Sequence, residues 1–463
     1  MKTLKNFVNE INGLRFMVEN LKLNSGIGKK FLLAQKIIVN ESELKAELWN
    51  LSQLYDFVNK SENSKSIFNI CNLLEHVNDI HSTIKNLHNS RVLDDVELFE
   101  IKKFCIVSQS ILEELRNSDF NVLQFHDSSK IIDALDPEHS GIQSFYIYSA
   151  YNSHLEELRK KQNEMSSIDK NLAEKYRLDC VEIEDNIRQK LSKELSVYSK
   201  ELQHNLDQLA YLDVLIAKSI QATELNLCQA EISTEITEYK SIFNPQISDI
   251  LHSQSKEFQA VDIKLYNKPC LITGANMSGK TVLLKTIALA QYLFQFGFFV
   301  PAKSAKIVLV DEVMLSVGDN QSELNGLSSF AVEMLNVNNI LTQVKTGTKV
   351  LVLVDELART TNPDEGKAFV NAFVEMMSDY NVRCLITTHY SGISTNCRRL
   401  RVKGLIIGNE TKNVSVENIN DFMDYSLSEI HDDNIPAEAI RIAEILGVDE
   451  ELIAKTKRYL TTV

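Results

Sequence analysis

The chain contains 463 residues, of which 44% are hydrophobic and 24% are charged, and its formal net charge at pH 7 is −14. This length exceeds what one hydrophobic core usually supports, so two or more domains are expected, and the apolar runs are too short to cross a bilayer. The acidic balance opposes non-specific attraction to a nucleic-acid backbone, although a local basic patch would still allow DNA binding.

Residues 1–240 are predicted to form a mostly helical core and lever domain. They contain a single proline, Pro137, and long stretches in which apolar residues recur at helical spacing. The clearest helix is predicted from Ile183 to Leu215, and it is either an ordinary core helix or a long arm that moves. The N-terminal segment MKTLKNFVNEINGL lacks the apolar core of a secretory signal, which predicts a cytoplasmic location.

Residues 241–430 differ in character and are predicted to form an α/β domain with a largely buried sheet. Short β-branched runs alternate there with helical segments. Residues 431–463 are predicted to form two helices around Gly447, a helix-turn-helix whose acidic neighbours disfavour a role in reading DNA. The strands are expected at 270–273, 306–310, 350–354, 384–387 and 404–407.

A nucleotide-binding loop is predicted where the first of these strands meets a helix expected from Val282 to Phe294. The intervening segment has the pattern G-x-x-x-x-G-K-[ST], whose glycines let backbone amides and the helix N-terminus face phosphate groups. Lys280 is expected to reach the β- and γ-phosphates of ATP, and the Thr281 hydroxyl to hold Mg²⁺. The candidate binding residues are Gly274, Ala275, Asn276, Met277, Ser278, Gly279, Lys280 and Thr281.

Two pairs of adjacent carboxylates follow apolar strands and compete for the hydrolytic role. After the strand at 350–354, Asp355 is expected to hold Mg²⁺ through water and Glu356 to polarise the attacking water. The pair Asp311–Glu312 is the alternative, although it continues into another apolar stretch. His389, at the end of a later strand, is either a structural histidine or a sensor of the γ-phosphate.

Taken together, these motifs resemble the ATPase of the MutS family of DNA mismatch-repair proteins, in the family's order over residues 256–460. The further matching phrases are Phe299–Ala302, Asn325–Phe330 with Val332-Glu333-Met334, and Asp355–Thr361. The resemblance implies the α/β P-loop ATPase fold that MutS and ABC proteins share, hydrolysis of ATP to ADP and phosphate with Mg²⁺, and a homodimer or a pairing with a related subunit. It also implies that Phe258 stacks on adenine, that Ser328 reaches the partner's nucleotide, and that the C-terminal helices dimerise.

The chain also departs from the family pattern. Leu327 replaces an arginine of the signature loop, and Ala358 and Thr360 replace two glycines. The gap between the matches Tyr151–Leu158 and Leu209–Val214 is too short for the family's DNA clamp beside the expected long helix. No F-x-E wedge precedes the core, because the only such triplet, Phe373-Val-Glu375, lies in an expected helix of the ATPase domain, so mismatch reading is not expected.

Three functions therefore stand beside one another. One is a dimeric ATPase that acts on branched or recombining DNA, which follows from the family resemblance. Another is a protein-remodelling ATPase, since the resemblance extends to MutS-like proteins that are thought to reactivate adenosylcobalamin-dependent lysine 5,6-aminomutase by exchanging damaged cofactor. The third is a nucleotide-binding dimer with little turnover, which the presence of both the P-loop and the carboxylate pair disfavours.

Overall fold

The computed structural model divides the chain into two compact units. One unit comprises residues 1–20, 36–48 and 222–463, and the other comprises residues 21–35 and 49–221. No helix in the described part of the chain is long and apolar enough to span a membrane. The structure describes residues 2–116, 120, 122–139, 145–274, 278–317, 329–405, 419–430 and 438–460.

The first residues of the chain belong with the C-terminal half, because they pack on it. The ring of Phe7 lies 5.0 Å from that of Tyr292, and the Ile38 amide donates to the carbonyl of Gln295 at 2.9 Å. The predicted domain boundaries at 240 and 430 stay predictions. In the division into compact units, the helical unit ends at Gln221, and the α/β unit includes residues 1–20 and 36–48.

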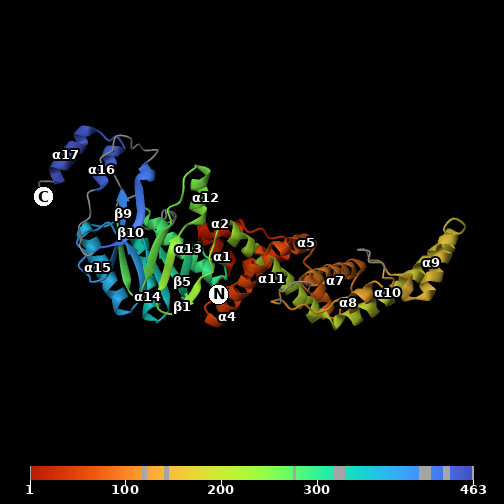
Figure 1. Ribbon diagram of the computed structural model, residues 1–463. Coiled ribbons are helices and arrows are strands. Elements are labelled where there is room, and N and C mark those ends of the chain that lie inside the picture. Colours follow the sequence, from red (N-terminus) through yellow and green to blue (C-terminus); the bar gives the residue numbers. More distant parts are fainter. Residues whose placement is uncertain are drawn as a thin grey trace. The chain divides into compact units, whose positions relative to one another are not determined.

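The second unit is helical, as the apolar spacing predicts (Figure 1). Its α3 is fixed by Asp213, whose buried carboxylate accepts from the amide and hydroxyl of Ser25 at 2.8 and 2.6 Å. The unit's elements are α3 (Gly26–Ala34), most of α4 (Glu41–Asn59), η1 (Ser61–Asn63), α5 (Ser64–Leu74), α6 (His81–His88), α7 (Asp95–Arg116), α8 (Ser129–Leu135), η2 (Ser149–Tyr151), α9 (Ser153–Met165), α10 (Lys170–Ser196) and α11 (Ser199–Glu224) as far as Gln221.

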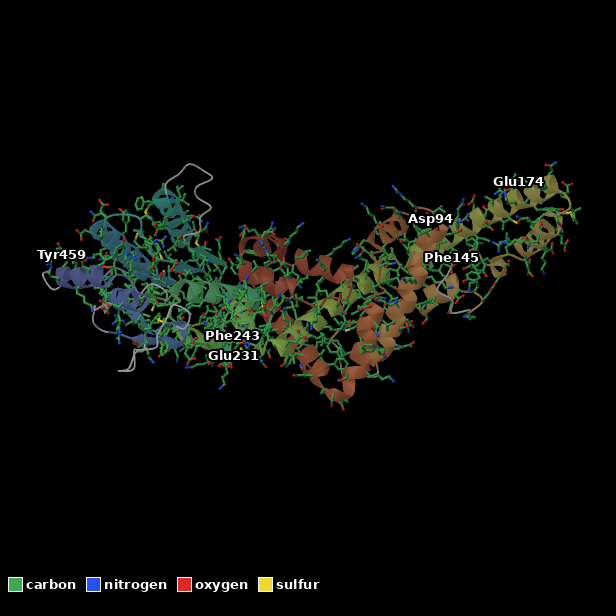
Figure 2. The ribbon with its side chains drawn as sticks, turned by 90° about the horizontal axis from the view of Figure 1, so that it is seen from above. Asp94, Phe145, Glu174, Glu231, Phe243 and Tyr459 are labelled. Atoms are coloured by element: carbon green, nitrogen blue, oxygen red, sulfur yellow. The ribbon has the colours of Figure 1, made fainter. Side chains whose placement is uncertain are left out.

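The prediction of a single helix from Ile183 to Leu215 is wrong, because α10 ends at Ser196 and a second helix, α11, begins at Ser199. The Ser196 hydroxyl donates to the carbonyl of Lys193 at 2.7 Å, and such side-chain bonds compete with the helical backbone pattern. Between 151 and 209 every residue is described and none is in a strand. The residues before this break form the helix pair α9–α10, on which Figure 2 labels Glu174. Its surface carries ion pairs such as that of Glu174 with Arg177.

The first unit contains two sheets, and the predicted helical and α/β content is confirmed. A four-stranded sheet has the order β1-β5-β2-β3, and a six-stranded sheet has the order β10-β9-β4-β8-β7-β6. In the larger sheet β10 runs antiparallel to β9, and the other pairings are parallel. The strands are β1 (Glu231–Ser233), β2 (Thr237–Ile242), β3 (Val261–Leu265), β4 (Pro269–Thr273), β5 (Ser304–Val308), β6 (Glu312–Ser316), β7 (Val350–Val354), β8 (Arg383–Thr387), β9 (Arg398–Leu405) and β10 (Met423–Glu429).

All five residues of β4, β7 and β8 are buried, which explains why β7 and the central residues of β4 and β8 are apolar. The carboxyl ends of these parallel strands meet at one edge of the sheet, and the candidate site lies there. The helices of this unit are α1 (Leu4–Glu10), α2 (Asn12–Glu19), α12 (Pro245–Ser253), α13 (Lys280–Gln295), α14 (Ser329–Lys345), α15 (Pro363–Asp379), η5 (Ile419–Phe422), α16 (Glu438–Ile445) and α17 (Glu450–Leu460).

Two predicted strands shift in the structure. The run at 306–310 contributes to β5, which ends at Val308, and the next strand begins at Glu312. Near the end of the domain, β9 extends to Leu405 and the following residues lie outside the described part. Because β5 ends at Val308 and β6 begins at Glu312, the competing pair Asp311–Glu312 lies at the start of β6 and not at the end of a strand.

Candidate nucleotide-binding site

The loop between β4 and α13 depends on two glycines. A Cβ on Gly274 would lie 2.9 Å from Oγ of Ser278, and one on Gly279 would lie 3.1 Å from the ring of Tyr425. Gly279 caps the first turn of α13 with a φ of 78°, a conformation that residues with a Cβ rarely adopt. Of the four predicted residues between these glycines, Ala275, Asn276 and Met277 lie outside the described residues.

A buried positive charge stands at the start of α13. The side chain of Lys280 is 5% exposed, and its Nζ donates to the carbonyl of Gly274 at 2.9 Å. The hydroxyl of Ser278 is also buried and makes no hydrogen bond within the described part of the chain. A buried ammonium group, an unsatisfied hydroxyl and the N-terminus of a long helix together favour a bound anion such as phosphate.

The carboxylate of Asp355, which follows β7, forms hydrogen bonds to residues of α13 and β8. Oδ2 of Asp355 accepts from the Thr281 hydroxyl at 2.6 Å, and Oδ1 accepts from the Thr387 hydroxyl at 2.7 Å. The Thr387 hydroxyl in turn accepts from the Glu356 amide at 2.9 Å. Asp355 and Thr281 are oxygen donors of the type Mg²⁺ prefers, and they fit an ion that takes its remaining ligands from phosphate and water. No cluster of three His, Cys, Asp or Glu side chains that could hold a metal ion is found in the described part of the chain.

Glu356 follows Asp355 in the sequence, and its carboxylate faces Lys280. Its Oε1 lies 3.9 Å from Nζ of Lys280, its Oε2 lies 3.5 Å from Nη1 of Arg359, and its side chain is 15% exposed. The carboxylate is therefore held beside the buried charge and still reaches solvent. A water molecule and a phosphate group could both approach it.

The competing pair lies at the opposite end of the strands. Glu312 pairs with Val350, the first residue of β7, whereas Asp355 follows the last residue of that strand. Asp311 caps this end, since its Oδ2 accepts from the amide of Lys349 at 2.9 Å. At about 3.3 Å per residue, the length of β7 separates the two acidic pairs by roughly 16 Å.

His389 is not brought into contact with the other predicted catalytic residues among the described contacts. Its imidazole is exposed, and its ring centroid lies 4.3 Å from that of Tyr390. The preceding residue, Thr388, is buried and donates its amide to the carbonyl of Ile272 at 3.0 Å. Ser328, predicted to act across a dimer, lies outside the described residues.

A cavity of about 720 Å³ opens beside the loop between β4 and α13, and Phe258 is one of the residues that line it. This volume falls in the range of small-molecule binding pockets. The side-chain amide of Gln259 connects this residue to β10. Its Nε2 donates to Oδ1 of Asp424 at 2.8 Å, and its Oε1 accepts from the backbone amide of Tyr425 at 2.9 Å. Ile247, Leu251, Val282, Leu283 and Tyr425 give the cavity an apolar lining next to Ser278 and Gly279.

Sequence reasoning missed two residues of this site. Thr387 was visible only as part of a polar strand end, and its bonds to two consecutive acidic residues depend on strand pairing. Tyr425 lies 166 positions beyond Gln259, so no local motif connects it to the cavity. The roles assigned to the remaining residues stay predictions.

Comparison with known proteins gives a matching family and several relatives. Residues 270–463 match the family model for MutS domain V. The DNA mismatch repair protein MutS of Clostridium kluyveri is 26% identical over 334 residues, which is 71% of this chain and 36% of that protein. The Endonuclease MutS2 of Caldicellulosiruptor saccharolyticus is 32% identical over 229 residues (46% of this chain, 28% of that protein), and that of Thermus thermophilus is 36% identical over 186 residues (40% and 24%). The chain thus spans between 24% and 36% of the length of these relatives.

Proposed function

We propose that this chain, which belongs to the MutS family by its MutS domain V, is a P-loop ATPase that binds ATP with Mg²⁺ and hydrolyses it to ADP and phosphate. The observation that carries the proposal is the chain of bonds from Thr281 through Asp355 to Thr387, with Lys280 and Glu356 beside it. These groups lie at the start of α13, which follows β4, and at the carboxyl ends of β7 and β8, the edge at which such sheets bind ligands.

Each residue then has a stated task. The loop amides, the helix N-terminus and Lys280 bind the phosphates, and the apolar cavity with Phe258 receives the adenine. Thr281, and Asp355 through water, would hold Mg²⁺, which would supply positive charge to the phosphate oxygens. Glu356 orients and polarises the attacking water, because its carboxylate is exposed enough to meet water and lies beside the buried ammonium group.

Replacing Phe258 with alanine is expected to weaken the binding of a fluorescent ADP analogue about 5- to 150-fold, since stacking an aromatic ring on a base contributes ~1–3 kcal/mol. Binding of pyrophosphate, which has no base, should stay unchanged in a competition titration. Phe68→Ala removes a 65% exposed phenylalanine of the helical unit and serves as the control. Equal affinity of Phe258→Ala and wild type for the analogue would place the base elsewhere.

We further propose that the ATPase works as a dimer, either with itself or with a related MutS-like subunit, and that ATP binding switches its helical unit. The client we favour is a DNA structure, by the family relationship. A protein client, such as a cobalamin-dependent aminomutase, is the second candidate. It is favoured by the helical segment 151–209, which holds no strand, and by the net charge of −14.

The client is tested by measuring ATPase rates with and without duplex, mismatched and four-way-junction DNA, alongside direct DNA binding over a salt series. Stimulation by a DNA structure, with affinity that falls as salt rises, is the expected result for a nucleic-acid client. Measurable basal hydrolysis without binding or stimulation would refute DNA as the client and direct the next test to the aminomutase. A protein without basal hydrolysis would refute the ATPase itself.

A further inference from the structure

The turn that follows β7 and carries Glu356 has an unusual backbone. Glu356 has a φ of 49° and Ala358 a φ of 60°, and both carry a Cβ that disfavours the left-handed region. The family pattern has glycine where this chain has Ala358, and a glycine would adopt that conformation freely. Something else must therefore hold the turn in this chain.

One brace comes from α14. Oε1 of Glu333 accepts from the amide of Ala358 at 2.6 Å. The Glu333 side chain is partly buried, and this burial raises the pKa of its carboxyl group. The strained residue is thus held at its N–H by an acidic side chain from a different helix.

The second brace comes from the loop after β8. The buried Tyr390 donates its hydroxyl to the carbonyl of Ala358 at 2.7 Å. Its own amide donates to the Thr388 hydroxyl at 3.0 Å, which fixes the ring relative to the strand. A Cβ on Gly366 of α15 would lie 2.3 Å from the Tyr390 hydroxyl, so only glycine leaves room for this bond.

We propose that Glu333 and Tyr390 are positioning residues, which clamp Ala358 from both sides and thereby aim the Glu356 carboxylate. Both backbone groups of Ala358 are used, and Glu356 lies two residues earlier with its Oε1 3.9 Å from Lys280. Neither residue touches the nucleotide cavity lined by Phe258. The inference rests on the proposed hydrolysis of ATP and adds the residues that orient its general base.

The clamp predicts a loss in turnover without a loss in binding. Glu333→Leu keeps the approximate size and removes the acceptor, and we expect kcat to fall at least about tenfold, as for the loss of a hydrogen bond to a charged group. KM for MgATP and the affinity for a fluorescent ADP analogue should stay within about twofold of wild type. Glu333→Gln keeps an amide oxygen that accepts from Ala358, so it should retain most of the activity.

A double-mutant cycle separates positioning from general stability. Without the brace an alanine prefers other conformations, whereas a glycine still populates the left-handed one. The loss caused by Glu333→Leu should therefore be at least about threefold smaller in an Ala358→Gly background. Glu375→Leu, at an exposed acidic position of α15, is the matched control and should leave kcat unchanged.

These measurements use the full chain, with the thermal unfolding midpoint recorded for every variant. A wild-type enzyme that hydrolyses ATP, beside a Glu333→Leu variant with unchanged kcat, would overturn the clamp and leave the proposed function in place. Parallel losses of kcat, ADP affinity and unfolding midpoint, without relief by Ala358→Gly, would show a merely structural contact and also overturn it. A wild type that binds ADP and shows no turnover would remove both proposals.

Discussion

Replacing Glu356 with glutamine is expected to slow ATP hydrolysis at least ~10²-fold while nucleotide binding persists. Glutamine has nearly the same shape, and the bond from the residue-356 amide to the Thr387 hydroxyl does not involve the side chain. The amide cannot take a proton from water, so the loss falls on the chemical step. Phosphate release in a single turnover, together with titration of a fluorescent ATP analogue, measures the two effects separately.

The second acidic pair provides a matched control for this substitution. Glu312→Gln makes the same chemical change at the amino end of β6, beside Val350 rather than beside Lys280. We expect its turnover to equal that of wild type. Normal hydrolysis by Glu356→Gln together with loss in Glu312→Gln would reverse the assignment and contradict the geometry of the sheet.

The parts of the fold that could be predicted are those with a strong local signal. The strands at 270–273, 350–354 and 384–387 are fully buried, so their sequences are continuous apolar runs that periodicity detects. The loop before Lys280 also has a strong local signal, because its glycines and lysine form a contiguous motif. Local chemistry was sufficient for these elements.

The missed features depend on contacts between distant segments. Residues 1–20 and 36–48 join the α/β unit through contacts such as that of Phe7 with Tyr292, which helical periodicity cannot reveal. The strand predicted at 306–310 ends earlier than expected, because β5 ends at Val308 and β6 begins at Glu312 in a different sheet. The brace on Ala358 was also invisible, since Glu333 and Tyr390 reach it only after α14, β7 and β8 have packed.

Replacing Lys280 with methionine is expected to weaken ATP binding by about 10²-fold, because a buried charge that contacts phosphate is removed. Methionine has a similar length and no charge, and removing a 5% exposed ammonium group relieves its desolvation in the free protein. This relief offsets the loss of the bond to the Gly274 carbonyl and of the contact with Glu356, so the unfolding midpoint without nucleotide should not fall. The increase in midpoint that MgATP produces should largely disappear.

Lys349→Met makes the same change at an exposed position near the amino ends of the strands, and it should keep full affinity. Equal affinity of the two variants would mean that the phosphates bind away from the loop between β4 and α13. A lower midpoint for Lys280→Met without nucleotide would instead assign Lys280 to the stability of that loop, through its bond to the Gly274 carbonyl. Retained stability with lost nucleotide stabilisation is the combination expected if the charge of Lys280 contributes more free energy beside a bound anion than beside Glu356 and the Gly274 carbonyl.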